Sequence, residues 1–122
     1  MGNIKAIILD LDQTLTTDET SWLQFTELVG TDKEKHIQIF DDYKAGKLVY
    51  AQAKKELIKL WETTGKTQKD DIMQAFQKVR FRKGVEDAVK YLSQKYTLCI
   101  ISGAIDTFVE VASKRLDIKH FY

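Results

Sequence analysis

The feature that most constrains this chain is a short apolar run that ends in two carboxylates. Residues 3–16 read Asn-Ile-Lys-Ala-Ile-Ile-Leu-Asp-Leu-Asp-Gln-Thr-Leu-Thr. The run Ile4–Leu9 is rich in β-branched residues, which predicts a strand buried on both faces, as in a parallel sheet covered by helices. Ligands of such sheets bind just outside the carboxyl ends of the strands. Asp10 and Asp12 come at that position, and Thr14 follows them.

The two acids have no evident structural purpose at the end of a strand. Their charges repel one another unless a cation or a shared proton relieves the repulsion. A hard divalent ion such as magnesium favours oxygen ligands and usually keeps substrate phosphate among them. From these residues alone, two solvated acids in a turn remain the alternative, because a short Asp-x-Asp pattern has a real false-positive risk.

A second candidate position follows another apolar run. Residues 96–101 predict a buried strand that ends at Ser102-Gly103-Ala104, at the junction with the next helix. The beginning of a helix offers free amides to an anion, and a serine hydroxyl can donate to a phosphate oxygen. Serine is also a common helix N-cap, so the signal from Ser102 alone is weak. Its pairing with the acids at the end of the first strand favours an anion site.

Helical periodicity fills the chain between these two positions. From Trp22 to about Phe81, apolar residues at helical spacing predict four short amphipathic helices, which would form a small bundle. A helix from Gly84, the strand 96–101, a helix over about 105–116 and a beginning strand at 117–122 follow. The predicted order is therefore strand, helical insert, helix, strand, helix, strand, which is typical of an α/β fold.

Composition narrows the class of protein. The chain has 122 residues, 43% hydrophobic and 30% charged, which suits one globular domain with a small insertion. A net charge of +1 disfavours nucleic acid as a partner, and no apolar run has membrane-spanning length. The single cysteine, Cys99, excludes an internal disulfide and suits the cytoplasm. We read Cys99 as a core residue, and His36 and His120 as exposed.

The stretch Asp10-Leu11-Asp12-Gln13-Thr14-Leu15-Thr16 resembles the signature of the haloacid dehalogenase (HAD) superfamily. The resemblance implies that Asp10 is a nucleophile that becomes phosphorylated and that Asp12 is the general acid and base. It implies that Thr14, Ser102 and Gly103 form the phosphate site. It also implies Mg2+ as cofactor, bound by Asp10 and by the backbone carbonyl of Asp12.

Over its whole length the chain resembles the N-terminal part of phosphoserine-phosphatase-like members of this superfamily. The stretches Gly46-Lys47-Leu48-Val49-Tyr50 and Ile100-Ile101-Ser102-Gly103-Ala104 carry the likeness beyond the first motif. The resemblance implies a partial Rossmann-like parallel sheet from residues 1–16 and 82–122, and a helical cap from residues 17–81. It places Glu19 where the family binds the substrate ammonium. The implied activity is hydrolysis of a small phosphorylated metabolite.

Three departures qualify the resemblance. Leu57 stands where the family has an arginine that holds the substrate carboxylate, which argues against phosphoserine itself. Ala104 replaces the second glycine of Ser-Gly-Gly. The family's later lysine and later acidic cluster have no counterpart in residues 1–122. Losing the positive charge that shields a transferring phosphoryl group costs orders of magnitude in rate.

Two further hypotheses follow from these departures. The chain could instead be a catalytically incomplete phosphate-binding or assembly module. In addition, the outer edge of the first strand would be bare, so we expect a homodimer or a missing C-terminal half to pair along it. A phospho-accepting receiver domain is discounted, because that fold has no helical insert after its first strand.

Overall fold

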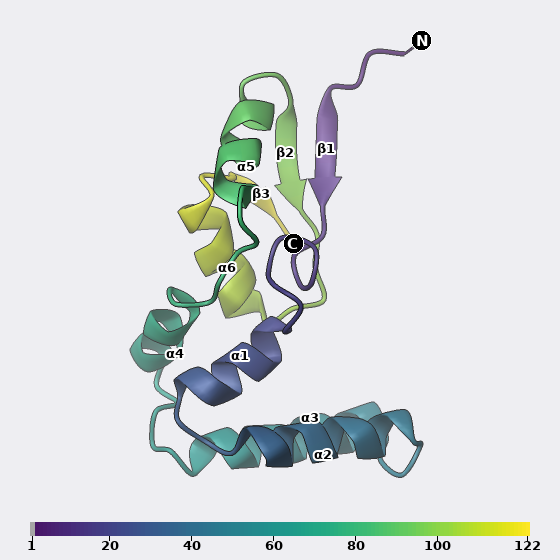
Figure 1. The fold of residues 1–122 in the computed structure, drawn as a ribbon, viewed down its shortest axis with the longest axis vertical. Helices are drawn as coiled ribbons and strands as arrows, with labels where there is room; N and C mark the ends of the chain where they lie inside the picture. Colours follow the sequence, from purple (N-terminus) through teal and green to yellow (C-terminus); the bar gives the residue numbers. More distant parts are fainter. Residues whose placement is uncertain (1) are drawn as a thin grey trace.

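The computed structural model describes residues 2–122 and confirms an α/β fold with a parallel sheet (Figure 1). Three strands and six helices occur in the described residues, in an order that matches the sequence prediction. Their bounds are β1 Ala6–Leu9, α1 Ser21–Leu28, α2 Lys33–Lys44, α3 Tyr50–Glu62, α4 Lys69–Phe76, α5 Val85–Ser93, β2 Thr97–Ile100, α6 Asp106–Arg115 and β3 His120–Phe121. None of these helices combines the length and the apolarity that a membrane crossing needs.

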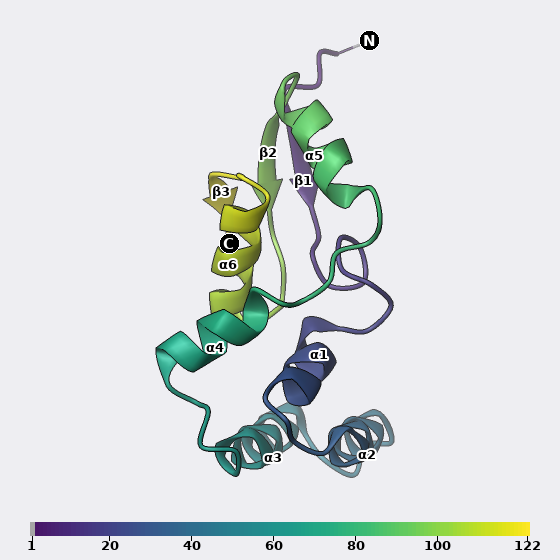
Figure 2. The same ribbon diagram turned by 60° about the vertical axis from the view of Figure 1, so that its left-hand side comes forward.

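The sheet has the order β1-β2-β3, and both pairs of strands are parallel. Leu9 of β1 lies opposite Ile100 of β2, and Ile7 lies opposite Leu98. These side chains share one face of the sheet and pack into the core. Both α5 and α6 lie on that face (Figures 1 and 2), as successive right-handed crossovers in one direction require.

The prediction that the first strand is buried on both faces is wrong. Ile8 is 66% exposed, and Ile4, just before the strand, is 69% exposed. Cys99 pairs with Ile8 and is half-buried on the same open face, so it is not a full core residue. An apolar run reveals that a strand is hydrophobic, but not whether helices cover both of its faces.

The helical insert leaves the sheet region and returns to it side by side. Thr16 forms an antiparallel bridge with Phe81, and the Arg82 amide donates to the Leu15 carbonyl at 2.8 Å. Between these points, helices α1, α2 and α3 gather at one end of the molecule (Figure 1). The division into a core of residues 1–16 and 82–122 and a cap of residues 17–81 stays a prediction.

An aromatic chain connects the insert to the sheet layer. The ring of Phe25 in α1 lies 4.9 Å from that of Phe76 in α4, and Phe76 lies 5.1 Å from Phe108 in α6. All three side chains are almost completely buried. The core is therefore continuous from the bundle to the helix that covers the sheet.

His36 is buried, which corrects the expectation that it is exposed. It shares a hydrogen bond with Thr26 Oγ1, and the same oxygen accepts the indole N–H of Trp61 at 2.8 Å. Burial lowers the pKa of His36, because the positive imidazolium loses its hydration. The hydrogen-bonded side chains of Thr26, His36 and Trp61 join α1, α2 and α3 within the bundle.

We expect the stability of the protein to fall in mild acid because of His36. Its folded pKa lies below the ordinary value of 6.5, so the unfolded chain binds the proton more readily. The stabilisation is therefore complete above about pH 6.5 and declines as the pH falls from there toward the folded pKa. Urea unfolding at pH 7.5 and pH 5 checks this, with the exposed His120→Gln as the control and His36→Gln as the test. An equal pH dependence in both variants would contradict the assignment to His36.

Candidate active site

The loop that follows β1 is a tight turn organised by one carbonyl. The Leu11 carbonyl accepts hydrogen bonds from the amides of Thr14, Leu15 and Thr16, at 3.3, 2.9 and 3.1 Å. Leu11 and Leu15 are buried and anchor the turn in the core. The turn holds Gln13 at a φ of 62°, a left-handed conformation that is uncommon for a residue with a side chain. The two acids are thus displayed from an anchored loop.

Asp10 is exposed at the carboxyl end of β1. Its Oδ1 accepts the Leu11 amide at 2.8 Å, and its Oδ2 accepts the Thr14 hydroxyl at a long 3.4 Å. Thr14 therefore orients the Asp10 carboxylate. The contact is loose, so Asp10 Oδ2 is accessible to an incoming electrophile.

Asp12 is half-buried and bound to the beginning of α1. Its Oδ1 accepts the Ser21 amide at 2.8 Å, and its Oδ2 accepts the Ser21 hydroxyl at 2.9 Å. Burial raises the pKa of Asp12, the two hydrogen bonds from Ser21 lower it, and the charge of Asp10 adds to the rise. The net effect is a raised pKa, which favours a carboxyl group that can hold and release a proton.

Replacing Ser21 by alanine is expected to raise the pKa of Asp12 further. The substitution removes the hydroxyl donor to Oδ2 but leaves the backbone donor to Oδ1 in place. A lost donor to the charged form makes that form less favourable. Carboxyl carbon shifts in an NMR titration measure this directly. An Asp12 midpoint that falls, or stays where it is, would show that the hydroxyl does not stabilise the carboxylate.

Ser102, Gly103 and Ala104 lie at the same edge of the sheet as Asp10. The Ile101 amide donates to the Leu9 carbonyl at 3.0 Å, so the two strands end at the same level. The Ser102 hydroxyl oxygen accepts the Ala104 amide at 3.1 Å, which leaves its own proton free to donate. The next helix begins only at Asp106, so this turn is not the helix N-terminus that the sequence suggested.

Gly103 leaves open space beside this turn. A Cβ built on it would meet no atom within 4 Å. None of the described residues accepts a hydrogen bond from the Gly103 amide. A free hydroxyl, a free amide and open space together suit an anionic oxygen.

The oxygen atoms at Asp10 and Asp12 would provide only part of the coordination shell of a hard cation. Asp10 offers an exposed carboxylate, and no described residue donates to the Asp12 carbonyl, so both oxygens can face an ion. Magnesium is often bound by one or two protein oxygens together with substrate phosphate and water. Within residues 2–122, however, no three His, Cys, Asp or Glu side chains come together as a metal cluster.

Glu19 faces basic partners. Its Oε1 accepts Lys33 Nζ at 2.6 Å, and Arg80 Nη2 lies 3.8 Å from its Oε2. That Oε2 is buried and has no hydrogen-bond partner among the described residues. The hydrogen bond to Glu19 raises the pKa of Lys33. The carboxylate is therefore largely neutralised by this chain's own cations.

Two residues that support the loop were not found from the sequence. Arg82 Nη2 donates to the Gln13 carbonyl at 2.7 Å and to Asp18 Oδ1 at 3.0 Å. Thr16 is fully buried, and its Oγ1 accepts the Gln13 amide at 2.8 Å. Thr16 lies within the recognised motif, but nothing in the sequence pairs Arg82 with a loop more than sixty residues away.

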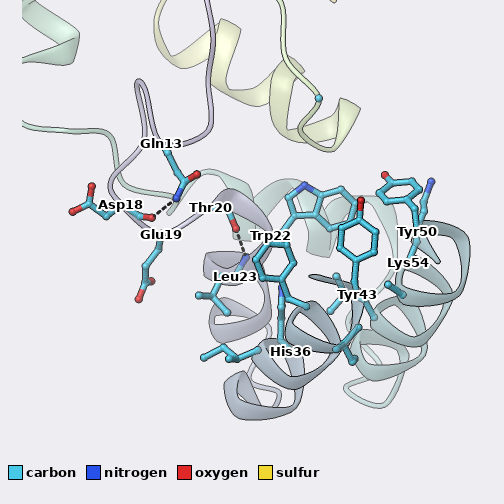
Figure 3. Close-up of a pocket in the computed structure, with 16 residues that line it drawn as sticks. Gln13, Asp18, Glu19, Thr20, Trp22, Leu23, His36, Tyr43, Tyr50 and Lys54 are labelled. Atoms are coloured by element: carbon cyan, nitrogen blue, oxygen red, sulfur yellow. Dashed lines mark hydrogen bonds between the residues drawn. The ribbon is translucent and has the colours of Figure 1, made fainter. Parts of the chain in front are cut away.

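A pocket of about 380 Å³ lies between this loop and helices α1–α3 (Figure 3). Gln13, Asp18 and Glu19 line it on the loop side, and Gly103 reaches it from the turn after β2. The helices contribute mainly apolar and aromatic side chains, which are Trp22, Leu23, Ile37, Ile39, Phe40, Tyr43, Tyr50, Ala53 and Leu57, together with Thr20, His36 and Lys54. The pocket therefore opens directly next to the candidate phosphate turn.

Comparison with protein-family models and with curated proteins gives no match to the sequence. Solved structures do match. A phospho-aspartyl intermediate analogue of phosphoserine phosphatase superposes with a TM-score of 0.67 and 21% identity, over 99% of this chain and 56% of that one. A HAD family hydrolase from Salmonella enterica serovar Typhi superposes with a TM-score of 0.76 and 18% identity, over 97% and 39%.

A substrate-bound phosphoserine phosphatase gives a TM-score of 0.68 and 20% identity, over all of this chain and 56% of that one. The fold is therefore that of HAD hydrolases of the phosphoserine-phosphatase type, as the first motif implied. The chain spans about half the length of the phosphoserine phosphatases that it matches.

Proposed function

We propose that this chain carries the nucleophile and the general acid of a magnesium-dependent phosphomonoester hydrolase. The observation that carries the proposal is the division of labour between the two acids. Asp10 is exposed and loosely held, whereas Asp12 is half-buried with a raised pKa. Paired groups whose environments differ in this way suit a nucleophile and an acid, respectively. That a phosphoserine phosphatase with this fold has a phospho-aspartyl intermediate analogue supports the same assignment.

The proposed reaction has two displacements. A carboxylate oxygen of Asp10 attacks phosphorus, the bond from phosphorus to the ester oxygen breaks, and the Asp12 carboxyl group gives its proton to the departing oxygen. Asp12, now ionised, takes a proton from water as the water oxygen attacks the aspartyl phosphate. Inorganic phosphate leaves and Asp10 is restored. Ser102 and Gly103 would donate to the phosphoryl oxygens throughout, and Thr14 would hold Asp10.

We propose that Asp10 and the Asp12 carbonyl would hold Mg2+. The ion would supply positive charge near the phosphoryl oxygens when bound. The predicted contact of Glu19 with a substrate ammonium stays a prediction, and Lys33 competes with it.

The test is Mg2+-dependent hydrolysis of phosphate esters, with the phosphorylated residue identified by mass spectrometry after borohydride trapping. The label is expected on Asp10, and Asp10→Asn should give neither label nor turnover. Asp117→Asn is a matched control, because Asp117 has a φ of 54° that asparagine also adopts. Turnover that persists in Asp10→Asn would exclude the mechanism.

A phosphate-binding or assembly module remains the second candidate. It is favoured by the lack of an acidic cluster among the described residues. Such a module would bind inorganic phosphate, with Ser102→Ala weakening the binding, and would show no turnover in any condition. Measured hydrolysis that depends on Asp10 would exclude it.

We also propose a cytoplasmic location, in keeping with one unpaired cysteine.

We further propose that another strand pairs along the free edge of β1. The carbonyls of Lys5 and Leu9 accept from the β2 side, so the backbone groups of Ala6 and Ile8 point to the free edge. A second copy of the chain, or a segment equivalent to the rest of the longer solved structures, would occupy it. Sedimentation of a dimer that Ile8→Pro converts to a monomer supports the second copy, and a stable wild-type monomer excludes that copy.

A further inference from the structure

We propose that the pocket between the first loop and helices α1–α3 takes an aromatic phosphate ester, rather than the phosphate ester of an amino acid. The inference rests on the proposed function in one respect, because it takes the Gly103 end of the pocket as the phosphate end. The volume of about 380 Å³ suits a small organic group.

The pocket offers aromatic side chains that are not covered. The rings of Tyr43 and Tyr50 lie 6.2 Å apart at an angle of 66°, in an edge-to-face arrangement. Both are substantially exposed, as is Phe40. Figure 3 shows Trp22, Tyr43 and Tyr50 grouped on the helix side of the pocket. Rings left open to water in a concave site favour a ligand that covers them with a flat apolar surface.

The two acidic groups of the pocket are already paired within the chain. Asp18 is bound to Arg82 at 3.0 Å, and Glu19 is bound to Lys33 at 2.6 Å. In Figure 3 the side chains of Asp18 and Glu19 point away from the aromatic group. An amino-acid ligand needs an acceptor for its ammonium group, and at each carboxylate that ammonium would have to compete with a cation of this chain.

The helix side of the pocket also lacks an arginine that could bind a carboxylate through two hydrogen bonds. Leu57 is buried in this wall, where an arginine could have bound a carboxylate through two hydrogen bonds. Lys54 is the one lysine or arginine in the lining, and no described residue forms an ion pair with it. It lies beside Tyr50 (Figure 3), so it adds a single positive charge to an aromatic wall. That combination suits an aromatic anion better than a zwitterion.

The orientation of the ligand follows from the two ends of the pocket. Gly103 brings the open turn after β2 into the lining, and Tyr43 of α2 and Tyr50 of α3 line the pocket from the helix side. A phosphoryl group at the turn would direct the organic part of the ester onto these rings. The aromatic wall therefore selects the leaving group and takes no part in the bond-breaking steps.

The test measures binding separately from turnover. Titration calorimetry on Asp10→Asn compares 1-naphthyl phosphate, phosphoserine and inorganic phosphate. Naphthyl phosphate is expected to bind more tightly than phosphoserine. Adding Tyr50→Ala should weaken naphthyl phosphate by about 2- to 10-fold, the value of one aromatic pair, and leave inorganic phosphate unchanged. Tyr91→Ala in α5 is the matched control, because Tyr91 is 56% exposed and Tyr50 is 59% exposed.

The outcomes separate this inference from the proposed function. Phosphoserine binding as tightly as naphthyl phosphate, or Tyr50→Ala without effect on naphthyl phosphate, would overturn the aromatic site even if the wild type hydrolyses esters. Selective naphthyl phosphate binding that depends on Tyr50 would support the aromatic site. If the wild type then releases no phosphate from any ester, the hydrolase proposal fails while the binding site stands.

Discussion

Asp12→Asn is expected to stop the protein after one turnover when the leaving group needs no proton. p-Nitrophenolate is a weak base, so Asp10 can displace it without an acid. Hydrolysis of the resulting aspartyl phosphate still needs a base for water, and asparagine cannot supply one. We expect a burst of about one equivalent of nitrophenol and a steady-state rate lower by roughly 10²- to 10⁴-fold, the usual value of general acid–base catalysis.

The fold should survive this substitution. The asparagine oxygen can accept the Ser21 amide, and its NH2 group can donate to the Ser21 hydroxyl, so the junction with α1 keeps its hydrogen bonds. Because the folded pKa of Asp12 is raised above its ordinary value of 3.8, the contribution of Asp12 to stability is complete below about pH 3.8 and is lost as the pH rises through the folded pKa. Asp12→Asn is neutral throughout and should be at least as stable as wild type at pH 7.

Stopped-flow absorbance gives the burst, and urea unfolding at pH 7 gives the stability. Ser21→Ala is the matched control, because it disturbs the same junction while keeping the carboxyl group. It should turn over repeatedly and show no stall. An Asp12→Asn variant with neither burst nor turnover, but a wild-type unfolding curve, would show that Asp12 is also needed for the first displacement.

The periodicity of the sequence was sufficient for the order of elements. Apolar residues at helical spacing predicted the four helices of the insert, and glycines such as Gly30 and Gly46, both at positive φ, mark their ends. The two candidate positions also follow from the chain, because parallel strands end at one edge of a sheet. Asp10 and Ser102 are therefore brought to that edge by the parallel pairing of β1 with β2.

Contacts between distant residues could not be predicted from the sequence. The open face at Ile8 depends on where both crossover helices lie, and a single strand contains no information on that. His36 lies on a polar stretch of α2 but turns inward to Thr26, a partner on another helix. The two hydrogen bonds from Ser21 to Asp12, which lower the pKa of Asp12 against the larger effect of burial, likewise require α1 to begin beside the loop. Secondary structure depends on nearby residues, whereas protonation and burial depend on packing.

Phe76→Ala is expected to cause a large loss of stability. Phe76 is 0% exposed and lies between the rings of Phe25 and Phe108. Truncating a buried phenylalanine costs about 3–5 kcal/mol, from lost burial and the cavity that remains. A domain of 122 residues has a total stability of roughly 6–18 kcal/mol, so the loss is a large fraction of it. Equilibrium urea unfolding measures the change.

The position of Phe76 also predicts how the variant unfolds. Both tryptophans lie in the helical bundle, Trp22 in α1 and Trp61 in α3. Their fluorescence therefore reports on the bundle, whereas circular dichroism reports on all helices. In the wild type, the two transitions should coincide as for one cooperative unit. In Phe76→Ala, we expect fluorescence to change at lower urea than circular dichroism, because the aromatic link to α6 is broken.

Phe40→Ala, at a half-exposed ring of the same bundle, should shift neither transition by more than about 0.5 kcal/mol. Coincident transitions in Phe76→Ala would mean that other contacts join the bundle to the sheet, such as the Arg115 guanidinium bonded to the Val79 carbonyl at 2.6 Å.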